Sequence, residues 1–294
     1  MNDYMITGID KGGNVSIKVI YAKDLVESAR TSHNLSPTAS ACLGRTLIMT
    51  SMIGDTLKDD NAKCTVMIKG DGPIGGIVVT SDNAMRTKGY VYNPSIDIPL
   101  KPNGKLDVSG AIGMGTLSII KDLGLKEPYS GMINLVSGEI AEDFTYYYTK
   151  SEQSPSAIGL GVLVDKDASI KTAGGFWISI LPGCKDEVID IIENNLKNVT
   201  SVTKEFEDNK TCEDLMKKLF NNLDYKIIED SKKPLWYCDC SKDKIGEALA
   251  SINKDELKQI IEEDGKAEIT CHFCNKVYDF NKEELENIYN GGTK

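Results

Sequence analysis

The sequence has few histidines and no cluster of basic residues, and these two absences exclude several classes of function. His33 and His272 are the only histidines among 294 residues, so a serine–histidine–aspartate nucleophile has few ways to form. Acidic residues number 44 against 34 basic ones, which gives a net charge of -10. Because neutralising phosphates requires a clustered basic face, we expect neither a nucleic-acid partner nor a membrane surface.

Long apolar runs and phosphate-binding motifs are also missing. No stretch reaches the roughly 20 apolar residues that span a bilayer, and the start MNDYMITGID lacks the basic and apolar regions of a secretory signal. We therefore expect a cytoplasmic protein. No GK[ST] phosphate loop occurs. Gly70, Gly72 and Gly75 form a GxGxxG pattern, but a strand follows it instead of a helix, so we predict a hairpin turn there.

The first 183 residues predict an α+β domain, because helix and strand patterns mix without regular alternation. Hydrophobic residues make up 40% of the chain, as in globular proteins. The predicted helices span 38–58 and 137–153. The predicted strands of this mixed-sheet domain span 63–69, 74–81, 88–93, 157–165 and 169–183.

Details of the first helix predict its start and its packing. Ser36 is a suitable cap, followed by Pro37 in the first turn. We expect His33, just before this cap, to lie in a surface loop. Gly44 and Gly54 lie inside the helix, where glycine costs stability, so we expect them to mark close packing against a neighbour.

Composition changes near residue 184. Residues 184–233 contain no glycine and many charged residues, with apolar positions at helical spacing. One amphipathic helix is marked by apolar residues at Val188, Ile191, Ile192, Leu196 and Val199, and a second follows a cap at Thr211. We interpret this segment as a helical connector. Its apolar faces must pack against another part of the chain, because so highly charged a segment would have little stability as isolated helices.

Pro234 opens the last segment, 234–294, which we predict to be a small zinc-binding domain. Ser241 and Asn253 are suitable caps for two short helices, and Gly265 ends the second. The run ITCHFCNKVYDF, residues 269–280, predicts a strand, a turn and a strand.

The eight cysteines form two groups. Cys42, Cys64, Cys184 and Cys212 are scattered, and scattered cysteines usually behave as small buried hydrophobes. The other four form a C-x-C pair and a C-x-x-C pair, at Cys238, Cys240, Cys271 and Cys274. Two such pairs can place four thiolates at tetrahedral positions around one Zn²⁺. We expect His272, inside the second pair, to lie near the metal without binding it.

The close spacing also indicates redox chemistry. Thiols at positions i and i+2 can oxidise to each other with little backbone movement, in a small and therefore reducible ring. An oxidant that formed the local bridges Cys238–Cys240 and Cys271–Cys274 would remove every zinc ligand. A segment of this size buries too little apolar surface to fold reliably without its metal. Oxidation is therefore predicted to release zinc and unfold the segment.

Short segments spread along the chain form a recognisable set. They are CDCS at 238–241, CHFCNKVYDF at 271–280, LGRTL at 43–47, KGDGPIGG at 69–76, YSG at 129–131, SEQSPSA at 151–157, and the GG and ILPG of 174–183. In these segments the chain resembles the 33 kDa chaperonin family, the redox-regulated heat-shock chaperones. The resemblance covers nearly the whole chain, and the connector matches least.

The resemblance implies an ATP-independent holdase and not an enzyme. In that family the reduced, zinc-bound form is a largely inactive monomer. Oxidative stress, usually with heat, forms the Cys238–Cys240 and Cys271–Cys274 disulfides and releases the zinc. The connector then unfolds, the protein becomes a homodimer, and exposed apolar surface binds unfolding client proteins. The four family ligands correspond to Cys238, Cys240, Cys271 and Cys274, whereas Cys42, Cys64, Cys184 and Cys212 lie outside the motif.

Two other classes of function fit parts of the sequence. A disulfide oxidoreductase could use the Cys271–Cys274 motif, although that motif normally opens a helix and here has strand-like flanks. A zinc module that binds a partner constitutively would also carry four cysteines. Catalytic turnover of a disulfide substrate would favour the enzyme, and binding unaffected by peroxide would favour the constitutive module.

Overall fold

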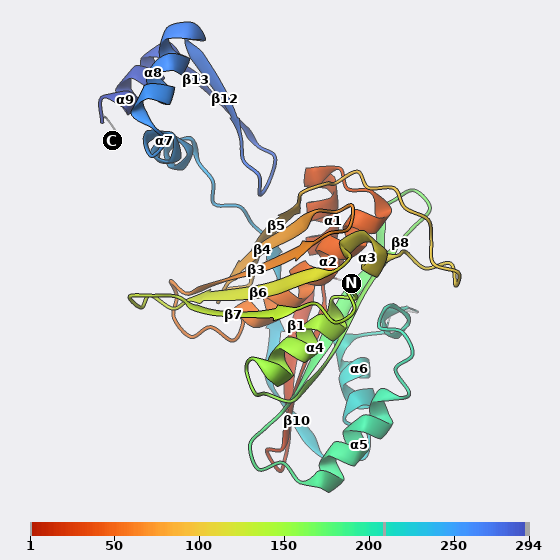
Figure 1. The fold of residues 1–294 in the computed structure, drawn as a ribbon. Helices are drawn as coiled ribbons and strands as arrows, with labels where there is room; N and C mark the ends of the chain where they lie inside the picture. Colours follow the sequence, from red (N-terminus) through yellow and green to blue (C-terminus); the bar gives the residue numbers. More distant parts are fainter. Residues whose placement is uncertain (1, 208–209, 292–294) are drawn as a thin grey trace. The chain divides into compact units, whose positions relative to one another are not determined.

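The computed structural model describes residues 2–207 and 210–291, which form two compact units, Met1–Tyr237 and Cys238–Lys294 (Figure 1). Both units combine helices with β-strands, and this confirms the α+β class. The three-part division into 1–183, 184–233 and 234–294 remains a prediction about how the segments behave. Within the described residues, every helix is too short or too polar to cross a bilayer.

The first unit is built from two sheets with a buried helix between them. One sheet has the strand order β10-β1-β2-β9-β8, and the other has the order β11-β5-β4-β3-β6-β7. Neighbouring strands are antiparallel except for the pair β11 and β5, so the predicted mixed sheet is confirmed. The strands are β1 (Tyr4–Asp10), β2 (Val15–Tyr21), β3 (Lys63–Gly70), β4 (Gly76–Asp82), β5 (Arg86–Val91), β6 (Gly115–Asp122), β7 (Tyr129–Asn134), β8 (Ser156–Val164), β9 (Ile170–Ile180), β10 (Tyr225–Lys232) and β11 (Leu235–Trp236).

Helix α2 (Pro37–Gly54) lies between the sheets and contacts strands of both, including β4 and β8. Its cap is Ser36, as predicted, whose side chain accepts a hydrogen bond from the backbone of Ala39. Apart from Arg45, every residue after Pro37 in this helix is buried. A helix covered by two sheets meets protein on all sides, and its sequence is apolar almost all round.

The glycines of α2 allow this close packing, which confirms the prediction. A Cβ atom on Gly44 would lie 2.7 Å from Val26 and 2.9 Å from Val162. At Gly54 it would lie 2.4 Å from the carbonyl oxygen of Asp82. The helix ends at Gly54, before the predicted Lys58. The following chain turns and places Asp55 beside β2 and β10.

The remaining predicted helices, strands and turn of the first unit are present, but the predicted environment of His33 is not. Gly70, Gly72 and Gly75 lie in and around the hairpin turn from β3 to β4, as predicted, and Gly75 has a φ of +73. His33, in contrast, is buried at the end of a helix with its ring edge-on to Trp236, and the surface-loop prediction is wrong. The further helices are α1 (Lys23–His33), α3 (Val108–Ile112) and α4 (Ala141–Lys150).

The connector contains the two predicted helices, α5 (Asp186–Leu196) and α6 (Cys212–Leu219), with a short 3₁₀ turn, η1 (Thr203–Phe206), between them. The helices lie beside the five-stranded sheet (Figure 1). Their apolar side chains join those of the sheet in one buried cluster, which includes Ile6, Val15, Ile17, Val19, Phe176, Ile178, Ile192, Leu215, Met216, Leu219 and Phe220. The predicted need for a surface under these helices is therefore confirmed.

Strand β10 is the element of the connector that the helical pattern misses. It pairs antiparallel with β1, with Tyr225 opposite Asp10 and Lys232 opposite Met5. The run YKIIEDSK shows no clean alternation, because Ile227 and Ile228 are both exposed. Its charged residues suit an edge strand, where they discourage pairing with other chains.

Helix α6 should lose stability when its cap is removed. The hydroxyl of Thr211 accepts a hydrogen bond from the backbone of Asp214, and the carboxylate of Asp214 accepts one from the Thr211 backbone at 2.8 Å. Replacing a capping threonine with alanine costs about 1 kcal/mol. In the variant Thr211→Ala we expect amide exchange in α6 to become about fivefold faster. Thr149→Ala is the control, because that hydroxyl bonds within its own helix, to the backbone of Thr145. Unchanged exchange in α6 would contradict the prediction.

The second unit has a small core. It contains α7 (Lys242–Ala250), α8 (Lys254–Glu263), β12 (Lys266–Thr270), β13 (Val277–Asn281) and α9 (Lys282–Tyr289). Ser241 and Asn253 cap the first two helices, and Gly265 follows the second with a φ of +64, as predicted. The sequence pattern does not predict α9, which Asn281 caps. Among its described residues, the buried cluster consists of Leu249, Leu257, Ile261, Cys271, Tyr278, Phe280 and Leu285.

Candidate metal centre

The second unit brings its four cysteines together from two places in the chain. Cys238 and Cys240 lie in the irregular segment that leads to α7. Cys271 and Cys274 lie in the turn between β12 and β13, which is closed by a hydrogen bond from the Cys271 backbone to Lys276 at 2.9 Å. This C-x-x-C pair therefore occupies a hairpin turn and does not open a helix, so the geometry does not favour a disulfide oxidoreductase.

The sulfur atoms are spaced as a metal site requires. All four lie within 4.8 Å of one another. The Sγ atoms of Cys238 and Cys271 are 3.8 Å apart, and those of Cys240 and Cys274 are 3.4 Å apart. Four sulfurs in a tetrahedron at about 2.3 Å from Zn²⁺ would be about 3.8 Å from one another. The cluster thus fits a tetrathiolate metal ion. His272 is not one of this group of four, and it is exposed.

The electrostatics of the cluster favour a thiolate at Cys240. Burial raises the pKa of this thiol, but hydrogen bonds from the Tyr278 hydroxyl and the neighbouring thiols outweigh it and lower the pKa to about 7. The Tyr278 hydroxyl donates to Cys240 Sγ at 3.1 Å. At Cys274, burial is the dominant effect and raises the pKa. Because zinc binds the thiolate form, a lowered pKa at one sulfur assists metal binding near neutral pH.

Tyr278 is the residue of this site that the cysteine pattern does not reveal. It lies on β13, four residues after Cys274. The burial pattern of β13 alternates, with Tyr278 and Phe280 inside. Alternation alone predicts a buried aromatic side chain at this position. Its role as a donor to a thiol of the other cysteine pair depends on the fold.

The four scattered cysteines lie in the first unit. Cys42, Cys64 and Cys212 are buried, as predicted, and burial raises the pKa of each to about 12. Cys184 is only half-buried, and its pKa is also raised, chiefly by burial. Such thiols stay protonated at neutral pH and are poor nucleophiles while the fold is intact.

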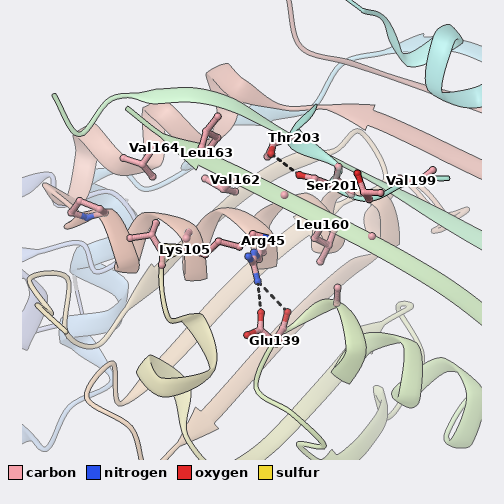
Figure 2. A pocket seen from close by; sticks show the side chains of 18 of the residues that line it. Arg45, Lys105, Glu139, Leu160, Val162, Leu163, Val164, Val199, Ser201 and Thr203 are labelled. Atoms are coloured by element: carbon pink, nitrogen blue, oxygen red, sulfur yellow. Dashed lines mark hydrogen bonds and ion pairs between the residues drawn. The ribbon is translucent and has the colours of Figure 1, made fainter. Parts of the chain in front are cut away.

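The first unit also has an open pocket of about 1000 Å³ where the connector meets β8 (Figure 2). Leu160 and Val162 of β8 line one wall, and Val199 and Ser201 of the connector line another. A Cβ atom on Gly161 would lie 2.8 Å from the side chain of Thr203, so the connector rests directly on this strand.

An ion pair lies in the lining of the pocket. Arg45 Nη1 contacts Glu139 Oε2 at 3.0 Å, as Figure 2 shows, and Lys101 contacts the same carboxylate. Burial raises the pKa of Glu139, but Lys101 and Arg45 outweigh that effect and hold the pKa below its ordinary value. The carboxylate is therefore ionised at neutral pH and is unsuited to act as a general acid.

Comparisons with known proteins give matches to one family over nearly the full length of this chain. The family model described as Hsp33 protein matches residues 3–281. Proteins named 33 kDa chaperonin from Acetivibrio thermocellus and Halalkalibacterium halodurans are each 45% identical to the chain. The alignments cover 97% of this chain and 96% of the first relative, and 98% and 99% for the second. The crystal structure of a 33 kDa chaperonin, a heat shock protein 33 homologue from Thermotoga maritima, superposes with a TM-score of 0.91. The two chains are 37% identical in sequence, and the match covers 99% of each. The chain therefore belongs to the Hsp33 protein family, a family of chaperones.

Proposed function

We propose that this protein is an ATP-independent holdase controlled by the oxidation of its four clustered cysteines. In the reduced form Cys238, Cys240, Cys271 and Cys274 bind one Zn²⁺ and the chaperone is inactive. Oxidation forms the Cys238–Cys240 and Cys271–Cys274 disulfides and releases the zinc. The observation that carries this proposal is the gathering of four sulfur atoms within 4.8 Å. The cytoplasm, where thiols are kept reduced, is the compartment in which such a switch would respond to stress.

Energy favours unfolding of the second unit after oxidation. A structural zinc supplies an apparent folding free energy of about 10–16 kcal/mol. Disulfides that close rings of three and four residues stabilise the folded state by only about 1.6 and 1.9 kcal/mol, through the chain entropy that they remove from the unfolded state. The apolar core of the unit is too small to supply the difference. The unit would therefore lose its fold when the metal leaves.

The connector covers the apolar surface that clients would use. Helices α5 and α6 bury side chains such as Ile17, Val19 and Ile178 of the five-stranded sheet. When the connector leaves, this sheet face and the apolar sides of both helices become accessible together. Such a surface binds exposed apolar segments of unfolding proteins without using ATP. The same surface would support the homodimer of the oxidised form.

The proposal predicts a reversible loss of zinc under peroxide. We expect peroxide, with mild heat, to release one Zn²⁺ per chain, because oxidation removes all four thiolate ligands together. Zinc release is measured with a chromogenic chelator. Protection of a heat-unfolded client against aggregation is measured by light scattering. Reductant with added zinc should reverse both changes.

Three outcomes would contradict the proposal. The first is zinc that stays bound after all four thiols are oxidised. The second is a protein that protects clients equally well in both redox states. The third is disulfide mapping by mass spectrometry that finds only bridges between the two cysteine pairs, because the proposed bridges lie within each pair.

A further inference from the structure

Tyr278 lies where it can control one sulfur of the cluster. Pairing of β13 with β12 places it opposite Ile269, and its side chain is only 7% exposed. From there its hydroxyl donates a hydrogen bond to Cys240 Sγ at 3.1 Å. The bond joins the hairpin that carries Cys271 and Cys274 to the segment that carries Cys240. It therefore reaches across the two halves of the site.

A cation next to Tyr278 strengthens this interaction. Lys276, two residues earlier in the chain, places its Nζ 5.1 Å from the centre of the Tyr278 ring. A cation over an aromatic face draws electron density from the ring. The phenolic hydroxyl then becomes a stronger donor. A hydrogen bond to a thiolate in turn withdraws electron density from sulfur, and this makes the sulfur a weaker nucleophile.

We propose that Tyr278 is a positioning residue that holds the Cys240 sulfur in the cluster and slows its reaction with oxidants. The inference rests on the proposed zinc–thiol switch and concerns how easily that switch responds. In the reaction with hydrogen peroxide, the Cys240 thiolate gives two electrons to the peroxide. A sulfur–oxygen bond forms, the oxygen–oxygen bond breaks, and hydroxide leaves, so that Cys240 becomes a sulfenic acid. The hydrogen bond from Tyr278 stabilises the charge on the sulfur and so makes it a weaker donor of these electrons.

The matched variants are Tyr278→Phe and Tyr289→Phe. Each loses one hydroxyl and keeps its ring; Tyr278 belongs to the small buried cluster, Tyr289 packs against it, and each ring has a lysine nearby. Lys254 Nζ is 5.9 Å from the Tyr289 ring. The two changes differ in that the hydroxyl of Tyr278 contacts a cluster sulfur. Loss of an outer-shell partner typically weakens metal binding or alters reactivity by about 10-fold or more.

The experiment uses the full-length, zinc-loaded, reduced protein and hydrogen peroxide. We measure the rate of zinc release with a chromogenic chelator and follow the oxidation of each cysteine by timed alkylation and mass spectrometry. We expect Tyr278→Phe to release zinc about 10-fold faster than the unaltered protein, with Cys240 oxidised ahead of Cys271. Tyr289→Phe should behave like the unaltered protein. A general loosening of the unit would instead speed the oxidation of all four cysteines equally.

Two results would overturn the inference. One is a Tyr278→Phe variant that releases zinc at the unaltered rate or more slowly. The other is acceleration without any preference for Cys240. If Tyr278→Phe fails to load zinc, Lys276→Met keeps the hydroxyl and removes only the cation, and it should produce a smaller acceleration in the same direction. If the unaltered protein binds no zinc, or keeps its zinc under peroxide, the proposed switch itself is refuted. That outcome is distinct from the two above, which compare the variants with an unaltered protein that releases zinc.

Discussion

Removing zinc from the reduced protein will unfold residues 238–294 and leave residues 1–183 folded. The second unit buries a single small cluster, whereas the first has a helix enclosed by two sheets. Losing about 10–16 kcal/mol of metal-coupled folding energy exceeds the whole stability of a domain of this size. We expect backbone amides of α7, α8 and α9 to lose their protection when a strong chelator is added in the presence of reductant. Hydrogen exchange measured by mass spectrometry resolves the two units.

A ligand variant should reproduce this result without a chelator. Cys271→Ser removes the most buried of the four proposed ligands and should abolish tight zinc binding. Cys184→Ser is the matched control, because it removes a half-buried thiol that lies outside the cluster. The control should keep its zinc and the protection of the second unit. Full protection of residues 238–294 in zinc-free Cys271→Ser would show that the metal does not hold this unit together.

Replacing Asp55 with asparagine should loosen the connector strand. The Asp55 side chain is 1% exposed and contacts the ammonium groups of Lys18 on β2 and Lys232 on β10. Without its charge, both lysines would lose the carboxylate they share, although Lys232 would keep its ion pair with Glu229 at 2.7 Å. Breaking a buried pair is strongly destabilising, but the Lys232 side chain is 38% exposed and water screens part of the effect. We expect a loss of about 2 kcal/mol, which corresponds to about 30-fold faster amide exchange in β10.

Asp224→Asn provides the control for Asp55→Asn. Asp224 pairs with Lys11 just before β10, with both side chains largely exposed at 81% and 68%. Exposed pairs contribute little, so this change should leave exchange in β10 nearly unaltered. If the connector covers the client surface, reduced Asp55→Asn should also suppress client aggregation without peroxide. Exchange in β10 that is equal in the two variants would show that Asp55 does not hold the connector in place.

The sequence predicts local elements where a pattern and its end signals agree. Ser36 before Pro37, and Gly265 after α8, predict one helix start and one helix end that the structure confirms. His33 shows the opposite case. A lone polar residue near a cap indicates a surface loop, but the ring meets Trp236, which lies some two hundred positions further along the chain. Local spacing carries no information about such a partner.

The cysteine spacing by itself determined that four thiols could serve one metal, because a C-x-C and a C-x-x-C each present two sulfurs through local backbone geometry. Family membership could likewise be predicted from short motifs. Only the tertiary structure decided which groups surround those sulfurs and what restrains the connector. The Tyr278 hydroxyl reaches Cys240, and Asp55 meets Lys232, through strand pairing and packing between distant segments. Such contacts depend on the whole fold, because hydrogen bonds and ion pairs require atoms within a few ångströms and sequence separation does not set that distance.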